Sequence, residues 1–163
     1  MTADAIYIAT YSKTVNKYTI RFVNADENNT ELSSAEYDYG TAAADITKPS
    51  DPTKAADAQY TYTFTGWTPD IAEVTGNATY TATYSTTVNK YTVTFVDENG
   101  TTVLKEATEY DYGTAANDIA KPDDPTKEAT VDHVYTFAGW TPAIATVTEN
   151  ATYTASYTES VRK

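Results

Sequence analysis

The sequence predicts a mostly β fold of two tandem modules, and three observations support this class. The segments Val15 to Thr87 and Val88 to Ser160 both begin with VNKYT, and about 42 of their 73 aligned positions are identical. A fixed period of this size indicates an array of like structural units. The chain also contains 15 Tyr residues and many Thr residues, two types that favour strands. Several segments further alternate apolar and polar residues, as half-buried strands do.

The second repeat predicts a strand, a tight turn and a returning strand in its first half. Tyr91-Thr92-Val93-Thr94-Phe95-Val96 alternates, which places Tyr91, Val93 and Phe95 on one face. Asn99-Gly100 follows, a dipeptide that favours a tight hairpin. Thr102 to Tyr112 is then expected to be the returning strand.

The second half of this repeat predicts a helical turn, a loop and two further strands. We expect Thr114 to cap a short helical turn over Ala115 to Ile119. The proline-rich segment 121–125 predicts a loop. Val134 to Phe137 predicts a strand that stops at the following Gly-Trp-Thr-Pro. The last strand, Ala151 to Tyr157, has Ala and Tyr inward and hydroxyls outward.

The repeats define the expected domain boundaries. Residues 15–87 form repeat 1 and residues 88–160 form repeat 2. Residues 1–14 are expected to be the last strand of a preceding repeat or an added start, and residues 161–163 the start of the next repeat. The hairpin of repeat 1 aligns poorly with that of repeat 2, which predicts a different hairpin length or bulge. The joint STTVNK is too short and strand-like for a flexible linker.

Composition excludes several functional classes. The chain of 163 residues has a formal net charge of −12 and no cysteine. No basic patch exists to neutralise phosphates, so nucleic acid is not an expected partner. The acidic balance also disfavours anionic membrane surfaces. Without cysteine, disulfides and most zinc sites are excluded, and no apolar run is long enough to insert in a membrane.

The motifs YTVTF, EYDYG, KPDDPTK, YTFAGW and ATYTASY together resemble the Listeria–Bacteroides repeat, also called the internalin B-repeat family. The resemblance covers nearly the whole chain. It implies an α+β module of the β-grasp-like kind, with a short helix packed on a small mixed sheet. It also implies an extracellular, cell-wall-attached parent in Gram-positive or gut bacteria. Residues 55–61 and 128–134 form a longer and different stretch from the one usual in that family.

The sequence offers little catalytic chemistry, and we expect a protein that is not an enzyme, with no cofactor and no metal. His133 is the only histidine and Tyr60 replaces it in repeat 1, so no Ser-His-Asp set can be built there. Glu36 and Asp38 recur as Glu109 and Asp111. Two carboxylates that are neighbours on one small strand are more simply explained as a solvated face than as a catalytic pair. Lysine–asparagine crosslinks are a further hypothesis, and its recurring candidates are Lys17, Lys90, Asn77 and Asn150.

Trp67 and Trp140 have two interpretations. An exposed indole beside several Tyr residues stacks on a sugar ring, whereas a buried one fills the core of a small Tyr-rich module. We favour the core position. The residues that remain candidates for ligand binding are Trp67, Trp140, Tyr60 and His133.

Two functions follow from these observations. The first is a semi-rigid stalk or spacer that presents an adhesive domain at a bacterial surface, with neighbouring repeats of the same chain as partners. The alternative is a repeated weak binding module for host glycans, glycoproteins or matrix proteins, acting through avidity. Exposure of the two indoles is the feature that discriminates between them.

Overall fold

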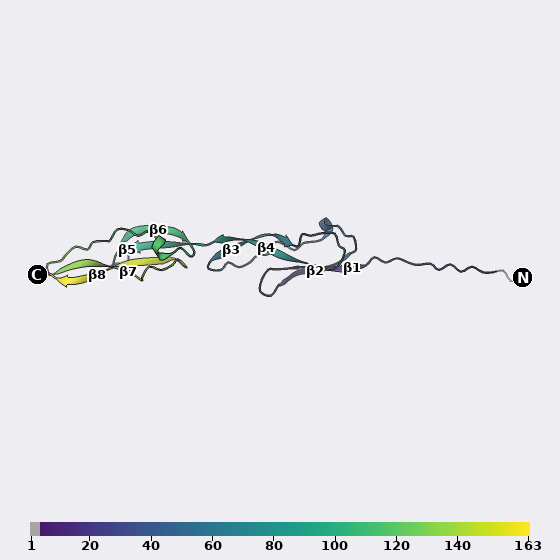
Figure 1. Cartoon of the computed structure of the whole chain (residues 1–163), viewed down its shortest axis with the longest axis horizontal. Coiled ribbons are helices and arrows are strands. Elements are labelled where there is room, and N and C mark those ends of the chain that lie inside the picture. Colours follow the sequence, from purple (N-terminus) through teal and green to yellow (C-terminus); the bar gives the residue numbers. More distant parts are fainter. Residues whose placement is uncertain (1–3) are drawn as a thin grey trace. The chain divides into compact units, whose positions relative to one another are not determined.

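The computed structural model describes residues 4–163, and within that range it contains eight strands and two 3-10 turns (Figure 1). In chain order these are β1 (Lys17–Val23), β2 (Glu31–Asp38), η1 (Ala43–Asp45), β3 (Tyr60–Thr68), β4 (Ala78–Val88), β5 (Lys90–Val96), β6 (Val103–Asp111), η2 (Ala116–Asp118), β7 (His133–Thr141) and β8 (Ala151–Val161). The prediction of a mostly β chain with two modules is therefore confirmed.

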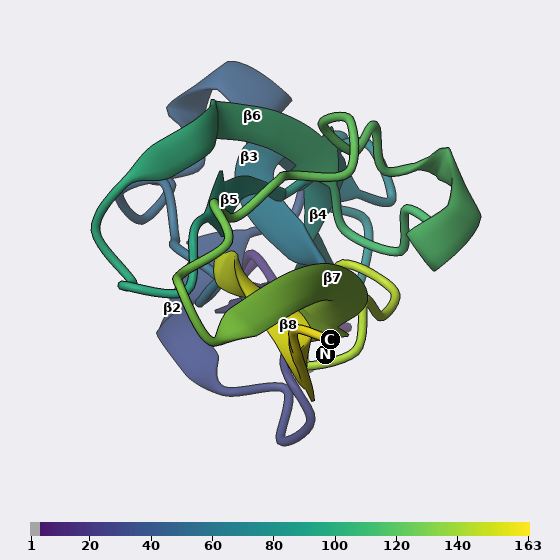
Figure 2. The same cartoon turned by 90° about the vertical axis from the view of Figure 1, so that its left-hand side faces the viewer.

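Each repeat forms one mixed sheet of four strands, in the order β2-β1-β4-β3 and β6-β5-β8-β7. In each sheet the first strand pairs antiparallel with the second and parallel with the last. Figure 2 shows β7 beside β8, and these two strands are antiparallel. The last strand of a repeat is thus a central strand, so a sheet of this order is complete only when that strand is in place.

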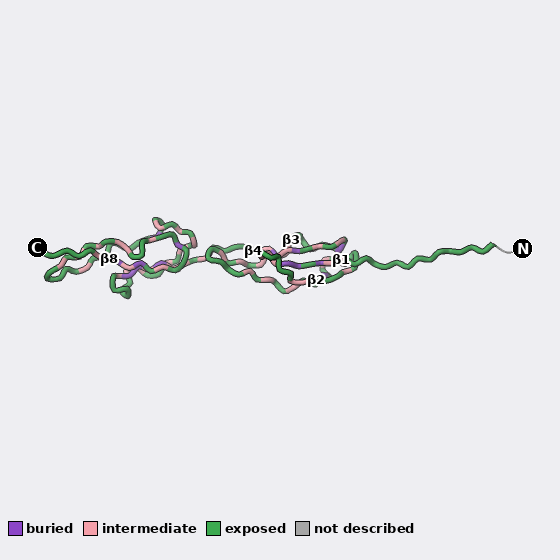
Figure 3. The backbone as a smooth tube through the Cα atoms, turned by 90° about the horizontal axis from the view of Figure 1, so that it is seen from below, coloured by how far each residue is buried: buried purple, intermediate pink, exposed green. Residues whose placement is uncertain are grey.

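The core of each sheet consists of residues that alternate along its central strands. Ile20, Phe22 and Tyr80 are buried in the first sheet, and their counterparts Val93, Phe95 and Tyr153 are buried in the second. Figure 3 shows buried stretches of the backbone in purple along the strands. The predicted inward faces of the first and last strands are therefore confirmed, because period-2 alternation places every second side chain on the core face.

The two hairpins differ, as their sequences predict. In repeat 2, Gly100 has φ 71°, which a glycine adopts without steric conflict. Asn29 has φ 47° in the hairpin of repeat 1, a left-handed conformation that asparagine tolerates better than most residues. The strand pairing is irregular near Phe22 in repeat 1 and near Phe95 in repeat 2. The differing hairpins therefore join strands that otherwise pair in the same order.

The short helical turn predicted over Ala115 to Ile119 is present but shorter than predicted, and the predicted cap by Thr114 is wrong. The structure has only η2, a 3-10 turn of three residues with no side-chain cap. Thr114 Oγ1 donates instead to the carbonyl of Asp111, at 2.8 Å, a local bond to the backbone that competes with capping. The small mixed sheets are thus present, while the β-grasp assignment and its short helix are not confirmed.

The strand predicted over Val134 to Phe137 is longer than expected. Strand β7 continues through Gly139 and Trp140 to Thr141, with an irregular register beside Gly139. Gly139 has φ 124° and thereby permits the backbone to bulge without ending the ladder. The Gly-Trp-Thr segment, predicted to stop the strand, therefore forms its last part.

The described chain divides into two compact units that follow the repeats except at residues 55–62 and at residues 86–87. The first unit contains Met1–Lys54 and Thr63–Ser85, and the second contains Ala55–Tyr62 and Thr86–Lys163. The segment Ala55–Tyr62 belongs to repeat 1 by sequence and yet groups with repeat 2 by contacts. Tertiary contacts therefore divide the chain differently from the repeat period at this segment.

Residues 4–16 form no regular structure and are exposed throughout, which Figure 3 shows as a green segment next to the N-terminal end. Residues 1–14 are predicted to be the last strand of a preceding repeat or an added start. Residues 1–3 lie outside the described residues, and for residues 4–14 the statement remains a prediction. Within residues 4–163, no helix is long and apolar enough to cross a membrane.

Candidate functional site

The two tryptophans pack against the aromatic core of their own sheets. The ring of Trp67 meets Phe22 edge-on at 4.8 Å between centroids and Phe64 at 5.3 Å. Trp140 makes the same contacts with Phe95 and Phe137, at 4.8 and 5.3 Å. Both indoles are part-buried beside the core clusters. Edge-to-face packing of this kind stabilises a core by more than the burial of its apolar area alone. Each indole therefore contributes to the core of its own module.

Tyr60 lies at the start of β3, in a turn that Asp57 organises. Asp57 Oδ1 accepts hydrogen bonds from the backbone N–H groups of Gln59 and Tyr60, at 2.8 and 2.7 Å. Asp57 Oδ2 accepts from the hydroxyl of Tyr62 at 2.6 Å, and this bond raises the pKa of Tyr62. The Tyr60 hydroxyl accepts from Gln59 Nε2. An aspartate that binds backbone N–H groups just beyond it stabilises a turn.

His133 is the counterpart of Tyr60 and begins β7. Its Nε2 lies 3.2 Å from Glu159 Oε1, and both side chains are more than one-third exposed. Its backbone N–H donates to Thr130 Oγ1 at 3.1 Å. A pair this exposed contributes little to stability. The structure thus places His133 at the surface beside β8, and the four predicted ligand-binding residues are not brought together in one repeat.

The structure draws attention to residues 55–62, which the sequence predicts only as a candidate binding surface and not as a segment in contact with the start of repeat 2. Within the second compact unit, the carboxamide of Asn89 donates to the carbonyls of Asp57 and Ala58, at 2.7 and 3.2 Å. The hydroxyl of Tyr91 also donates to the carbonyl of Ala58, at 2.7 Å. These bonds hold the divergent segment of repeat 1 against the first residues of repeat 2. We call Ala55–Tyr62, Asn89 and Tyr91 the junction site.

Asn89 uses both its side chain and its backbone at the junction site. Its N–H donates to the carbonyl of Gln59, its own carbonyl accepts from the N–H of Tyr112, and both distances are 2.8 Å. The amide oxygen of its side chain accepts from Thr61 Oγ1 at 2.7 Å. A carboxamide supplies a donor and an acceptor together, which explains why asparagine suits this position. The repeated VNK motif is the signal that sequence reasoning could have used.

The position equivalent to Asn89 at the C-terminal end of repeat 2 shows which of these hydrogen bonds need an asparagine. Arg162 takes its place there, and the N–H of Arg162 donates to the carbonyl of Asp132 at 2.8 Å. This backbone bond matches the one from Asn89 to Gln59. The guanidinium of Arg162 lies 3.4 Å from the carbonyl of Thr130, a longer contact than those that the Asn89 carboxamide makes.

The lysine of the repeated DPTK motif anchors the long loop of repeat 2. Lys127 Nζ forms an ion pair with Glu98 at 2.6 Å and lies 4.0 Å from the ring centroid of Tyr135. The hydrogen bond to Glu98 raises the pKa of Lys127. An ammonium over an aromatic face is attracted by the negative face of the ring. The motif therefore fastens its loop to β7 and to the β5–β6 hairpin.

Tyr157 lies beside this anchor and makes a second link to the hairpin. Its hydroxyl donates to Asp97 Oδ1 at 3.0 Å. Burial, followed by this bond to a carboxylate, raises the pKa of Tyr157 to about 12. In repeat 1 the hydroxyl of Tyr84 donates to the neutral Asn24. The two repeats therefore make the same link, but only repeat 2 uses a charged acceptor.

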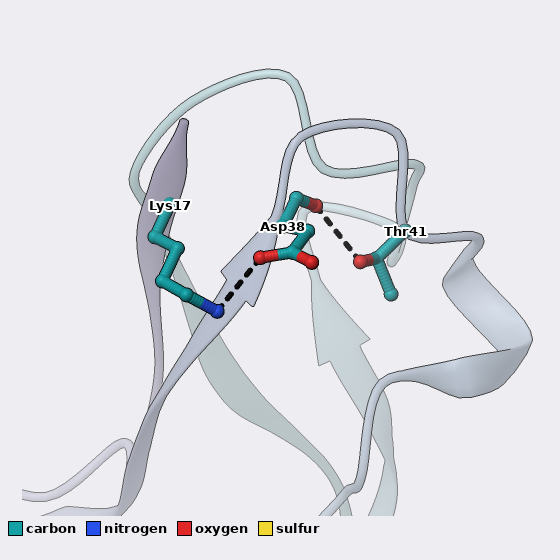
Figure 4. Close-up of polar contacts among 3 residues, drawn as sticks. All are labelled: Lys17, Asp38 and Thr41. Carbon is teal, nitrogen blue, oxygen red and sulfur yellow. Dashed lines mark hydrogen bonds and ion pairs between the residues drawn. The ribbon is translucent and has the colours of Figure 1, made fainter. Parts of the chain in front are cut away.

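The lysines considered for crosslinks pair with aspartates. Lys17 Nζ lies 2.7 Å from Asp38 Oδ1 and Lys90 Nζ lies 2.8 Å from Asp111 Oδ1, a contact that Figure 4 shows for repeat 1. These bonds raise the pKa of both lysines. The side chains of Asn77 and Asn150 accept instead from the backbone N–H groups of Thr19 and Thr92.

The same ion pairs bear on the repeated carboxylates of β2 and β6. Asp38 and Asp111 are each bound to a lysine and more than half exposed. Among residues 4–163, no group of three or more His, Cys, Asp or Glu side chains is placed to hold a metal ion.

The fold and the junction site define a class, a tandem-repeat protein whose modules are small mixed β-sheets. Residues 91–162 match the model of the Listeria-Bacteroides repeat domain (List_Bact_rpt). Repeat 2 therefore matches the Listeria-Bacteroides repeat, which confirms the resemblance that its motifs indicate, and repeat 1 is identical to repeat 2 at about 42 of 73 aligned positions. No curated protein matches the chain.

Among solved structures, the chain is similar to Streptococcal High Identity Repeats in Tandem (SHIRT) domains 3-4 from a cell surface protein. The identity is 18%, the TM-score is 0.36, and the match covers 90% of this chain and 99% of that chain. A similarity at this level supports no argument about mechanism.

Proposed function

We propose that this chain is a semi-rigid spacer in the extracellular part of a bacterial cell-surface protein, where it holds an adhesive domain away from the cell. The observation that carries the proposal is the junction site. The segment Ala55–Tyr62 is bound to Asn89 and Tyr91 by hydrogen bonds from both side chains. A loop held this way has fewer accessible conformations than a free loop, and it restricts the first residues of repeat 2 that it contacts, which supports a spacer role.

Two further features support a spacer. Strand β3 begins in residues that group with the second compact unit and continues into the first, and β4 begins in the first and ends in residues that group with the second. The surface location is supported by the repeat family, since such modules occur in bacterial surface proteins. The proposal also includes the absence of catalysis, because His133 and the repeated aspartates are engaged in exposed ion pairs.

The spacer proposal can be tested by measuring distances between the repeats. The chain contains no cysteine, so Ser34→Cys and Ala107→Cys, at equivalent exposed positions, provide one spin label in each repeat. We expect a narrow distance distribution from pulsed electron paramagnetic resonance, and a broader one when Asn89→Ala is added. The matched control is Asn16→Ala, which should leave the distribution narrow. A distribution already broad without Asn89→Ala would contradict the spacer role.

Repeated weak binding to host glycans or matrix proteins is less well supported. It needs accessible groups near Ala55 to Thr61, and the carbonyls of Asp57 and Ala58 are already bound by Asn89. The discriminating variant is Tyr60→Ala with His133→Ala, because neither side chain belongs to the core clusters. Glycan-array binding by the chain that this double variant loses while remaining folded would favour the binding function over the spacer.

A further inference from the structure

The first and last strands of each repeat lie side by side and point in the same direction. Residues 20–23 of β1 pair parallel with residues 78–81 of β4, and residues 93–96 of β5 pair parallel with residues 151–154 of β8. In a parallel pair, the beginning of one strand and the end of the other lie at opposite ends of the ladder. The chain therefore enters each repeat at one end of this ladder and leaves it at the other.

Tension along the chain acts on these two strands in opposite directions. A pull on the beginning of β1 and on the end of β4 slides one strand along the other. The hydrogen bonds between the strands run across them, so sliding strains all of these bonds at once. A pull that separates two strands from one end breaks the bonds one after another. The ladder between the first and last strands is thus loaded in the direction in which it resists most.

Aromatic side chains on the core face connect the same two strands. Phe22 of β1 is opposite Tyr80 of β4 in the register, and their ring centroids are 5.3 Å apart. Phe95 and Tyr153 form the same pair in repeat 2, at 5.4 Å. All four residues are buried, with at most 4% of each exposed. Sliding of the strands therefore requires that this core contact opens as well.

An asparagine adds one hydrogen bond at the beginning of each ladder. Asn77 directly precedes β4, and its Oδ1 accepts from the backbone N–H of Thr19 at 2.8 Å. Asn150 directly precedes β8 and accepts from the N–H of Thr92 at 2.8 Å. Both threonines come just before the residues at which the parallel pairing begins. The asparagine of the repeated NATYTA motif thus continues the connection between the strands where their backbone pairing ends.

The other two strands of each sheet lie outside the loaded pair. Strands β2 and β3 are the edges of the first sheet, and β6 and β7 are the edges of the second. In repeat 1 the chain between the paired strands, residues 24–77, contains both edge strands. While the ladder between β1 and β4 is intact, tension passes from one strand to the other across it. The edge strands and their loops are therefore not stretched.

We propose that the β1–β4 and β5–β8 ladders are mechanical clamps that keep each repeat folded when the chain is under tension, with Asn77 and Asn150 as positioning residues at the beginning of each clamp. The inference rests on the proposed spacer function, since a spacer that holds an adhesive domain transmits the force that acts on that domain. The clamp itself is a property of each sheet, so it can be measured independently of the spacer function.

The test is to unfold repeat 1 by force applied in two directions. Single-molecule force spectroscopy holds the full chain through two introduced cysteines, at Ser12 and Thr87 in one variant and at Ser12 and Thr75 in the other. All three positions are exposed, and the chain has no cysteine of its own. The first pair of attachment points slides β1 along β4, whereas the second pulls the beginnings of the two strands apart.

The two directions should differ in unfolding force and not in chemical stability. We expect the force with Ser12→Cys and Thr87→Cys to be at least about twice that with Ser12→Cys and Thr75→Cys, because forced unfolding follows the unfolding barrier along the direction of the pull. Without tension, urea should unfold the two variants at the same concentration. Equal unfolding forces in the two directions would overturn the proposal.

Substitution of Asn77 tests its role in the clamp. With the chain held at residues 12 and 87, Asn77→Ala should raise the rate of unfolding at constant force by roughly fivefold, as the loss of one hydrogen bond predicts. Asn77→Asp should restore the rate, because a carboxylate accepts the same bond from Thr19. The matched control is Tyr37→Phe, which removes the bond from the N–H of Thr47 to the Tyr37 hydroxyl, since this bond does not join β1 to β4.

The control should leave the rate of unfolding at constant force unchanged, even where urea shows a similar loss of stability for both variants. Equal acceleration by Tyr37→Phe and Asn77→Ala would show that the bond of Asn77 has no special place under tension, and would overturn its role. The spin labels at residues 34 and 107 test the spacer function separately. A narrow distance distribution with equal unfolding forces contradicts the clamp alone, and a broad distribution with unequal forces contradicts the spacer alone.

Discussion

The carboxamide of Asn89 donates to the main-chain carbonyl of Asp57 at 2.7 Å, although 32 positions separate the two residues. The same side chain accepts from Thr61, so it binds both ends of one short turn. A loop that is divergent between the repeats is thereby attached to the VNK motif, with which both repeats begin. The junction site thus joins a segment that differs between the repeats to one that they share.

Replacing Asn89 tests how much these bonds contribute. Asn89→Ala removes the hydrogen bonds to Asp57, Ala58 and Thr61. We expect a loss of about 1–2 kcal/mol in the free energy of unfolding, because the net contribution of each bond is about 1 kcal/mol and the carbonyls are partly solvated. Urea denaturation followed by circular dichroism measures the change.

Asn16→Ala is the matched control for this substitution. Asn16 is the asparagine of the VNK motif of repeat 1, and its carbonyl accepts from the N–H of Tyr39 as that of Asn89 does from Tyr112. The substitution preserves this backbone bond. Its effect should stay within about 0.5 kcal/mol, as for most surface substitutions. Equal losses for the two variants would show that the junction bonds contribute nothing specific.

The tryptophans should be structural. Trp67→Ala deletes an indole that packs on Phe22 and Phe64, and we expect a loss of about 2–4 kcal/mol, somewhat below the range for fully buried aromatic residues. Trp67→Phe should recover part of it. Since the chain has only two tryptophans, Trp140 then reports the unfolding of repeat 2 by fluorescence. A folded Trp67→Ala variant with unchanged stability would show that the indole is free for another role.

Stability should fall in alkaline solution because of Tyr157. Its pKa is raised to about 12 by burial and by the bond to Asp97, against about 10 in the unfolded chain. The folded state therefore keeps the phenolic proton that the unfolded state releases. The resulting stabilisation is complete below pH 10 and is lost as the pH rises towards 12. Denaturant titrations between pH 9 and 12 should show a shallower decline for Tyr157→Phe than for the parent chain.

Tyr84→Phe serves as the comparison in repeat 1. The pKa of Tyr84 is also raised, chiefly by burial, but its hydrogen-bond acceptor is the neutral Asn24. We expect this substitution to flatten the pH dependence less than Tyr157→Phe does. If the stability of both variants fell with pH as steeply as that of the parent chain, neither phenol would be responsible for the loss of stability in alkaline solution.

Lys127 should control the order of its loop. Lys127→Met removes the ion pair with Glu98 and the ammonium over Tyr135. We expect faster hydrogen exchange in residues 121–132, with the strands unaffected, because the loop loses its fastening to the sheet. Lys121→Met is the control from the same loop and should leave the exchange unchanged. Similar exchange in both variants would show that the DPTK lysine is not an anchor.

The parts of the fold that follow from local patterns were predictable. Alternation along residues 91–96 and 151–157 identifies the core strands, because a strand places every second residue on one face. Buried Val93, Phe95 and Tyr153 confirm those faces. The repeat period predicts that the structural elements of one copy recur in the other, and both sheets indeed have the same strand order.

The errors arose where tertiary contacts override local preference. Gly139 and the proline after Thr141 favour the end of a strand, yet pairing with β8 extends β7 to Thr141. The Ala-rich segment after Thr114 favours a helix, but the chain makes only a short turn there. Hydrogen bonds between the backbone of Gly113 and Thr114 and that of Val147 constrain this region, and no local pattern reports such a bond.

By itself the sequence determined the two modules, their strands and the aromatic side chains that fill each core, because these depend on period, alternation and composition. Only the tertiary structure decided what the divergent segment Ala55–Tyr62 does. Its bonds to Asn89 and Tyr91 use the main-chain carbonyls of Asp57 and Ala58. Every residue has a carbonyl, so the identity of the residue does not reveal which one will be bound. That depends on where the folded backbone places it.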